Sequence, residues 1–346
     1  MNYTFNEMKS QYAALRKTFD YIRSRKEEIL SFYKKHFCKS IIYIGCGSSY
    51  YLCQSAEFSA RVKLGIPAAA MAAGDLMLNY RSYLKALEGT LIIAPTRSGS
   101  TSEVLLALDN VKRVQPAPIL AITCVADSEI AKKADLTLEL PWAFDESVCQ
   151  TRTVTNLYAA NLLILGYLSD NQKLINDIDA AIEGGNSYIE KYEGKIKSLA
   201  EVDWRDVVVL ADGEMQGIAT EGALAFTEIA RVPGRYYHLL DVRHGPMVLI
   251  NNHTLVIVCM DAEGLEYQTA LISDLLNKGA TIVTYSDIPQ EPIPGVRLQI
   301  ASEIEFDQAV RGIPFIFISQ ALAYYKALQK GVDPDQPEGL EPWIKL

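Results

Sequence analysis

The chain has 346 residues, of which 49% are hydrophobic and 22% charged, and its formal net charge at pH 7 is -9. This balance is typical of a globular protein with a sizeable core and argues against disorder. The acidic charge and the lack of a Lys/Arg-rich run argue against nucleic acid as a partner, although local N–H groups and hydroxyls can still bind an anion. No apolar run reaches about 18 residues, so we expect no membrane span.

The reactive side chains narrow the class of protein further. The six cysteines form no CxxC pair, and with four histidines no motif collects metal ligands. We therefore expect buried, reduced thiols, no disulfide, no metal and no redox cofactor. The N-terminal residues do not resemble a signal peptide, since no basic start precedes an apolar run. These features predict a cytoplasmic protein.

Short apolar runs alternate with helical patterns along the first half of the chain. The spacing of apolar residues predicts one or two leading helices within residues 6–36. After them we expect strands at 41–45, 91–95, 118–123 and 136–140, and helices at 50–63, 102–111 and 155–168. Strands that alternate with helices indicate a parallel sheet covered on both faces.

The second half repeats this order. A polar helical stretch at 172–199 precedes expected strands at 207–213, 255–259, 281–285 and 296–300 and a closing apolar helix at 314–328. A repeat of about 165 residues is the size of a domain, not of a solenoid unit. We therefore predict an α/β protein made of a helical segment (1–35), a first α/β domain (36–170), a helical linker (171–200) and a second α/β domain (201–346).

A hydroxyl-rich loop, Thr96–Thr101, follows the strand predicted at 91–95 and precedes a helix. Ligands of parallel sheets lie at the carboxyl ends of strands, where helix N-termini offer unpaired N–H groups and a partial positive charge. Thr96, Ser98 and Thr101 add hydroxyl groups, and Arg97 adds a cation. The loop is therefore a candidate phosphate site, although Ser, Thr and Gly are also common in an ordinary capped turn.

A second small-residue loop, Gly45-Cys46-Gly47-Ser48-Ser49, lies at the end of the first predicted strand. Gly47, Ser48 and Ser49 would form the opposite side of the same crevice. The spacing is neither GxGxxG nor Walker A, which disfavours a nucleotide-dependent enzyme.

Several motifs in order resemble the sugar isomerase (SIS) domain family. They are the two loops at 45–50 and 96–101, the segment 147–153 with Gln150, the segment 221–229, and Arg243-His244-Gly245-Pro246 together with Asp335–Leu340. In this order they are similar to the isomerase part of glucosamine-6-phosphate synthases and to related sugar-phosphate deaminases and deglycases. The resemblance implies two tandem flavodoxin-like, three-layer α/β/α subdomains.

The resemblance also implies roles for single residues. It places a sugar phosphate on Gly47, Ser48, Ser49, Thr96, Arg97, Ser98, Thr101 and Gln150, and it makes Glu228 and His244 the catalytic pair. Moving a proton beside a sugar carbonyl needs a base, and opening a ring or protonating an amine needs an acid that titrates near neutrality. Judged without the family, Glu228 and His244 could each be a surface residue. The family's histidine comes from the neighbouring subunit, which implies a homodimer.

Some positions depart from the synthase pattern. Its lysine three residues before the glutamate is Ala225 here, and its lysine in the C-terminal tail is Pro342, with Lys345 nearby. Arg97 replaces a neutral residue and could bind an anion or pair with a nearby carboxylate. No glutaminase domain is expected. The positions of Tyr236, Tyr237 and His238 do not decide whether they line a pocket.

Two functions remain open. The first is an enzyme that acts on an amino-substituted hexose 6-phosphate as a deglycase, a deaminase or an aldose–ketose isomerase. The second is a non-catalytic sugar-phosphate sensor, which the duplicated domain and the presence of Glu228 and His244 disfavour.

Overall fold

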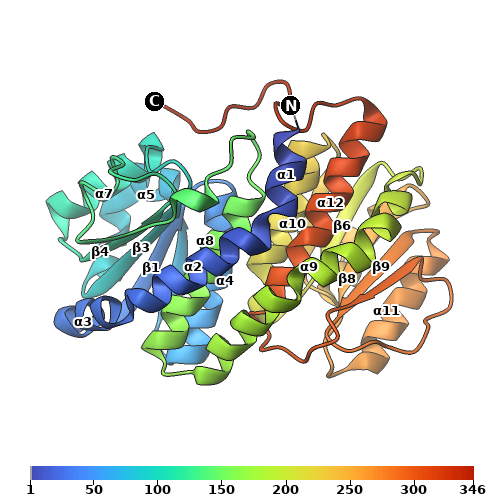
Figure 1. The fold of residues 1–346 in the computed structure, drawn as a ribbon, viewed down its shortest axis with the longest axis horizontal. Coiled ribbons are helices and arrows are strands. Elements are labelled where there is room, and N and C mark those ends of the chain that lie inside the picture. Colours follow the sequence, from blue (N-terminus) through green and yellow to red (C-terminus); the bar gives the residue numbers. More distant parts are fainter. Residues whose placement is uncertain (1) are drawn as a thin grey trace. The chain divides into compact units, whose positions relative to one another are not determined.

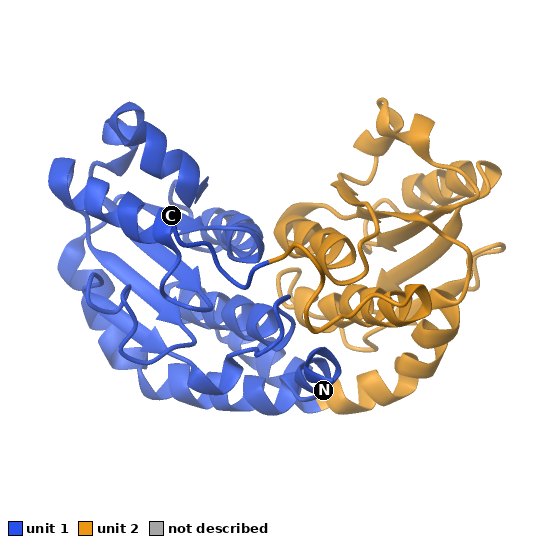
Figure 2. Ribbon diagram, turned by 90° about the horizontal axis from the view of Figure 1, so that it is seen from above, with its two compact units in different colours: residues 1–183, 341–346 blue, residues 184–340 orange. Residues whose placement is uncertain are grey.

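The computed structural model describes residues 2–346 and divides into two compact units (Figure 2). Unit 1 contains the chain up to Glu183 together with the C-terminal residues Glu341–Leu346, and unit 2 contains Gly184–Leu340. The helix α9, Gln172–Ala200, begins in unit 1 and ends in unit 2. The finer domain boundaries expected from the sequence stay predictions.

Unit 1 begins with three helices and continues as an α/β domain (Figure 1). Its strands are β1 (Ser40–Gly45), β2 (Ala68–Ala72), β3 (Thr90–Thr96), β4 (Ile119–Thr123) and β5 (Leu136–Glu139). Its α-helices before α9 are α1 (Tyr3–Lys9), α2 (Gln11–Ser24), α3 (Lys26–His36), α4 (Ser48–Leu64), α5 (Ala73–Asn79), α6 (Leu84–Leu87), α7 (Ser102–Val114) and α8 (Arg152–Leu168), with short 3₁₀ turns η1 (Tyr80–Tyr83) and η2 (Pro141–Ala143).

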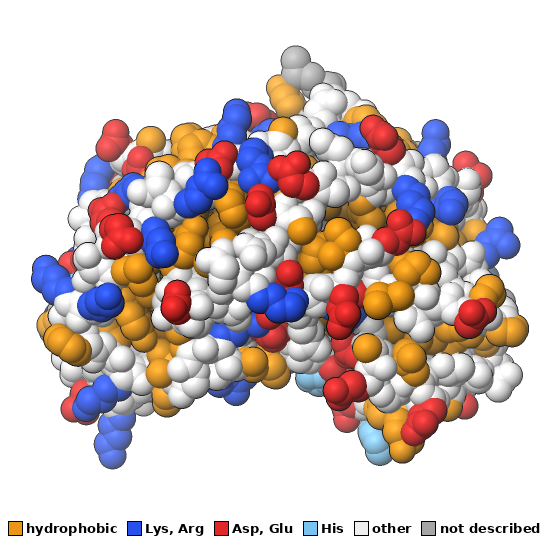
Figure 3. All heavy atoms as spheres, turned by 60° about the horizontal axis from the view of Figure 1, so that its bottom comes forward, with side chains coloured by type: hydrophobic (Ala, Val, Ile, Leu, Met, Phe, Trp, Pro, Cys, Tyr) orange, Lys and Arg blue, Asp and Glu red, His pale blue; other side chains and the backbone are white. Residues whose placement is uncertain are grey.

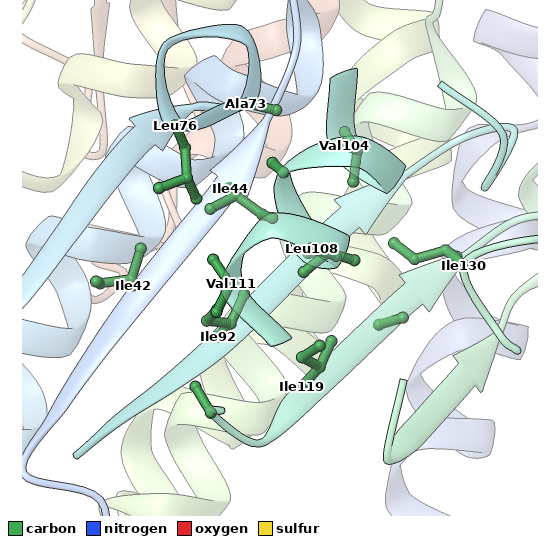
Figure 4. Close-up of a cluster of buried hydrophobic side chains, with 14 of the residues drawn as sticks. Ile42, Ile44, Ala73, Leu76, Ile92, Val104, Leu108, Val111, Ile119 and Ile130 are labelled. Carbon is green, nitrogen blue, oxygen red and sulfur yellow. The ribbon is translucent and has the colours of Figure 1, made fainter. Parts of the chain in front are cut away.

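The sheet of unit 1 is parallel and has the strand order β2-β1-β3-β4-β5. Alternate residues of its strands pack against α5 and α7 in one buried cluster, of which Figure 4 shows Ile44, Ile92 and Leu108. The helices α4 and α8 pack against each other and cover the opposite face. Because the side chains of a strand alternate between faces, these runs of buried apolar residues fill both layers.

Unit 2 repeats the topology of unit 1. Its strands are β6 (Asp206–Leu210), β7 (Gly234–Tyr237), β8 (Thr254–Cys259), β9 (Thr281–Ser286) and β10 (Leu298–Ala301), in the order β10-β9-β8-β6-β7. Its helices after α9 are α10 (Gln216–Ile229), α11 (Leu265–Asn277) and α12 (Gly312–Lys330), with turns η3 (Gly213–Met215), η4 (Asp241–Arg243) and η5 (Pro246–Leu249). Numbered within each unit, both sheets read 2-1-3-4-5, the flavodoxin-like order.

The predicted fold class is confirmed, down to the duplicated parallel sheets. The six cysteines are free thiols, and no helix among residues 2–346 is long and apolar enough to cross a bilayer. Across the same residues, no group of three or more His, Cys, Asp or Glu side chains is arranged to hold a metal ion. On the face drawn in Figure 3, basic and acidic side chains are interspersed.

Candidate functional site

The carboxyl ends of β1 and β3 lie side by side, since the two strands pair in parallel from Ser40↔Thr90 to Tyr43↔Ile93. The helix after β1 and the helix after β3 pack on opposite faces of the sheet. This is the topological switch point of a doubly wound sheet, where a crevice forms for ligands. The two loops singled out from the sequence therefore meet at one edge of unit 1.

The loop after β1 turns sharply into α4. At Gly45, a Cβ atom would lie 2.7 Å from the backbone carbon of Ser49, so only glycine fits. Gly47 has a φ of +53°, and Ser48 and Ser49 are buried at the first turn of α4. The structure thus places all three predicted residues at the N-terminus of α4.

The Thr96–Thr101 loop is shaped by its own hydroxyl groups. Thr96 Oγ1 accepts the N–H of Gly99 at 3.2 Å, and Ser98 Oγ accepts the N–H of Ser100 at 3.2 Å. Thr101 is the N-cap of α7, but its side chain makes no capping hydrogen bond. The first turn of α7 thus has no side-chain cap, although the N–H of Ser102 donates to the carbonyl oxygen of Ile344 at 3.3 Å.

Arg97 is buried in this loop, with 3% of its surface exposed. Its Nη1 donates to the carbonyl oxygen of Ser147 at 2.7 Å, and its Nη2 donates to the carbonyl oxygen of Pro342 at 2.5 Å. Both acceptors in these two bonds are backbone carbonyl oxygens. Arg97 thus adds positive charge beside the hydroxyl-rich loop.

The segment that carries Gln150 is held from two sides. The carboxylate of Glu7 on α1 accepts hydrogen bonds from Ser147 Oγ and from the N–H of Glu146. The buried carboxylate of Asp145 accepts the N–H groups of Thr151 and Thr153, each at 2.8 Å. Burial and the nearby Glu7 raise the pKa of Asp145 to about 6, against the opposing effect of its N–H donors and Arg152.

Gln150 itself has a buried Oε1 with no hydrogen-bond partner in the part of the chain that the structure describes. A buried acceptor of this kind costs free energy unless a ligand or water satisfies it. An O–H or N–H donor of a bound sugar would do so.

The two predicted catalytic residues lie in unit 2. Glu228 is half-buried near the C-terminal end of α10, and His244 is exposed directly after η4. Large apolar side chains flank His244 in the chain and face solvent: Leu240, Val248 and Leu249 are 42%, 78% and 55% exposed. Glu228 and His244 thus come from different elements of the same unit.

Unit 2 also brings together groups that the sequence left undecided. His238 Nδ1 lies 2.7 Å from Asp212 Oδ1 and 3.2 Å from the hydroxyl of Tyr236. Asp212 follows β6 and His238 follows β7, which are neighbouring parallel strands. The sequence signal for this pair is an aspartate and a histidine that each follow one of two adjacent strands. It could not be used, because β7 was not expected from the sequence.

The loop after β8 takes the place in unit 2 that the Thr96–Thr101 loop takes in unit 1, and it is acidic. A cavity of about 650 Å³ at this edge is lined by Asp261, Glu263, Asp287 and Glu305 around a buried Arg311. Arg311 pairs with Asp261 at 2.5 Å and with Asp287 at 3.0 Å. Burial raises the pKa of Asp287 to about 6, although Arg311 lowers it.

Comparison with known protein families finds a match that includes the loops of unit 1. Residues 36–165, which contain all three loops, match the family model of the SIS domain. Unit 1 contains a SIS domain. The sequence resemblance is thereby confirmed, and unit 2 repeats the strand order of this SIS domain.

The matches to curated relatives cover most of the chain, beyond the SIS domain of unit 1. A glutamine–fructose-6-phosphate aminotransferase (isomerizing) of Sulfurisphaera tokodaii is 28% identical over 88% of this chain and 50% of its own length. The D-galactosamine-6-phosphate deaminase AgaS of Shewanella sp. is 29% identical over 86% of this chain and 77% of its own length. The chain thus spans about half the length of the aminotransferases it matches and most of the deaminase.

A solved structure resembles the fold of the whole chain. The tagatose-6-phosphate ketose/aldose isomerase from Escherichia coli superimposes with a TM-score of 0.87, covering 99% of this chain and 98% of its own, at 21% identity. At this identity the likeness concerns the fold.

Proposed function

We propose that this protein is a cytoplasmic enzyme that acts on an amino-substituted hexose 6-phosphate. The observation that carries the proposal is the hydroxyl-rich loop Thr96–Thr101 at the switch point of the sheet, where the N-cap residue Thr101 makes no side-chain capping hydrogen bond. The six free cysteines fit a reducing compartment. Gly47, Ser48, Ser49, Thr96, Ser98 and Thr101 would hold the phosphate, with Arg97 contributing its charge and Gln150 Oε1 accepting from the sugar.

Among the reactions left open by the sequence, amine release is the one we put first. This chain covers 77% of the length of the deaminase, whereas the aminotransferase of Sulfurisphaera tokodaii is covered over 50% of its length and extends well beyond the matched region. Aldose–ketose isomerisation and deglycation share the same proton transfer and remain alternatives.

The chemistry needs one base and one acid. In the open-chain sugar phosphate, Glu228 would take the proton from the carbon that carries the amine and return it to the neighbouring carbonyl carbon. This leaves an imine, which water hydrolyses to a ketose phosphate and ammonia. His244 would exchange the proton needed for ring opening, because an imidazole titrates near neutrality.

We further propose a homodimer in which His244 completes the site of the partner subunit. The support is the exposure of His244 together with the apolar side chains of Leu240, Val248 and Leu249. Exposed apolar groups that gather in one loop are typical of a protein interface.

The reaction is tested by incubating the protein with glucosamine 6-phosphate, galactosamine 6-phosphate and fructosamine-type 6-phosphates while amine release and sugar isomerisation are followed. We expect turnover of at least one substrate and a loss of about 10²–10⁴-fold in Glu228→Gln. Glu201→Gln, an exposed carboxylate outside these loops, serves as the matched control. Tight binding of the phosphates without any turnover would instead establish the sensor function.

Mixing two inactive variants tests the shared histidine. When Glu228→Gln and His244→Asn dimers are mixed and allowed to exchange subunits, half of the dimers become mixed, and each mixed dimer regains one intact site. Activity should therefore return to about a quarter of the wild-type value. If both residues act within one subunit, every site keeps one lesion and no activity returns.

A further inference from the structure

The side chain of Arg97 is engaged by two segments that are far apart in the sequence. One arm of its guanidinium reaches the carbonyl of Ser147 and the other reaches the carbonyl of Pro342, while its centre lies 6.0 Å from the ring of Phe144. The planar fork of a guanidinium can hold two acceptors in fixed directions, which an ammonium group does less well. The geometry is that of a link between segments.

Each of these segments has a second anchor. Ser147 is also bound by Glu7, so the loop that carries Gln150 is held between α1 and Arg97. The C-terminal segment is also bound at the start of α7, where the N–H of Ser102 donates to Ile344 at 3.3 Å and the N–H of Leu346 donates to Ser102 Oγ at 3.0 Å. Arg97 therefore lies at the junction of the phosphate loop, the Gln150 loop and the C-terminal segment.

We propose that Arg97 is a positioning residue that fixes the Gln150 loop and the segment Glu341–Leu346 relative to the phosphate loop. This inference rests on the proposed sugar-phosphate site and adds how that site is kept in shape. Arg97 positions the two segments through its two carbonyl partners. Toward the phosphate it contributes only its positive charge. The sugar end of the ligand therefore depends on the link more than the phosphate end does.

The substitution Arg97→Lys separates these two contributions because it keeps the charge and loses the fork. We expect the affinity for inorganic phosphate to stay within about twofold of wild type, and the affinity for a hexosamine 6-phosphate to fall about tenfold, the value of one lost hydrogen bond of ordinary strength. Arg113→Lys, an exposed arginine on α7 bonded to Tyr80 and Asn110, is the matched control. An equal loss for both ligands would make Arg97 a plain phosphate ligand and overturn the proposal.

The C-terminal segment has its own reporter, Trp343. With 5-fluorotryptophan incorporated, Trp343→Phe assigns its ¹⁹F resonance. In Arg97→Lys this resonance should narrow and move toward the position of free 5-fluorotryptophan, while Arg113→Lys leaves it unchanged. An unchanged Trp343 resonance in Arg97→Lys contradicts the link. Since this readout needs no substrate, it tests the link even if the proposed function fails.

A double-mutant cycle measures the coupling between Arg97 and the segment Glu341–Leu346. In a chain that ends at Leu340, Arg97 has already lost one acceptor, so Arg97→Lys should reduce sugar-phosphate affinity by a smaller factor than in the full chain. Because this truncation removes only exposed and half-buried residues, it leaves the core of unit 1 intact. Equal factors in the two chains would show that Arg97 and the segment act independently, against the proposal.

Discussion

At the scale of single residues, Gly99 decides whether the Thr96–Thr101 loop can form. Its φ is +63°, and a Cβ atom there would lie 2.4 Å from Ser128 Oγ and 2.9 Å from Thr123 Oγ1. We expect Gly99→Ala to lower the free energy of unfolding by about 1–3 kcal/mol and to weaken phosphate binding, because the backbone must leave the left-handed region. Urea unfolding and phosphate titration measure the two effects.

Gly184→Ala is the control for this substitution. Gly184 lies inside α9, where a Cβ would meet nothing within 4 Å. Here alanine should stabilise the helix by about 0.5–1 kcal/mol and leave phosphate binding unchanged. Equal behaviour of the two variants would mean that Gly99 is not constrained as described.

The sequence identifies several site residues by type and order but not their contacts. The hydroxyls of the Thr96–Thr101 loop could be read from the strand–loop–helix pattern. The partners of Arg97 could not, because Ser147 and Pro342 are 50 and 245 positions away and offer backbone carbonyls, which carry no sequence signal. The sequence also could not show that the Oε1 of Gln150 is buried without a hydrogen-bond partner among the described residues.

At the scale of elements, the start of α8 depends on a buried carboxylate. Since the pKa of Asp145 is raised to about 6 in the fold, against about 3.9 in an unfolded chain, the fold binds this proton more tightly than the unfolded chain does. Its contribution to stability is complete below about pH 4 and is lost as the pH rises through about 6. We therefore expect Asp145→Asn to gain about 1–3 kcal/mol relative to wild type between pH 4 and pH 7.

Urea unfolding of both proteins at several pH values measures this gain. Asparagine Oδ1 can still accept the two N–H groups that Asp145 Oδ2 accepts, so the fold of the loop should persist. Asp20→Asn, an exposed partner of Arg23 on α2, should show no such gain. A constant difference between Asp145→Asn and wild type across this range would contradict the raised pKa.

The strands missed from the sequence are one edge strand in each sheet, β2 and β7. β2 is the alanine-rich Ala68–Ala72, and β7 is the short, half-buried Gly234–Tyr237. Neither has the run of buried branched residues that marked the central strands, and alanine and glycine are depleted in strands generally. Gly234 is required by packing, since a Cβ there would lie 1.9 Å from the carbonyl oxygen of Ala223 on α10.

At the scale of the whole molecule, two sheets of the same topology carry loops with different side chains. Both sheets have the 2-1-3-4-5 order, but the loop at the switch point bears hydroxyls in unit 1 and carboxylates in unit 2. The duplication was visible in the sequence as a repeated order of strands and helices. The divergence follows from single side chains: Asp261 and Glu263 occupy the loop of unit 2 and, together with Asp287, would repel a phosphate at short range.

The number of phosphates bound per chain follows from this divergence. We expect isothermal titration with a hexosamine 6-phosphate to give one site per chain. Thr101→Val should weaken that site, because the Thr101 hydroxyl makes no capping bond and is available to the phosphate. Glu263→Gln, in the corresponding loop of unit 2, should leave it unchanged. A stoichiometry of two, with the second site altered by Glu263→Gln, would show that the acidic loop also binds the ligand and that the two units have not diverged in this way.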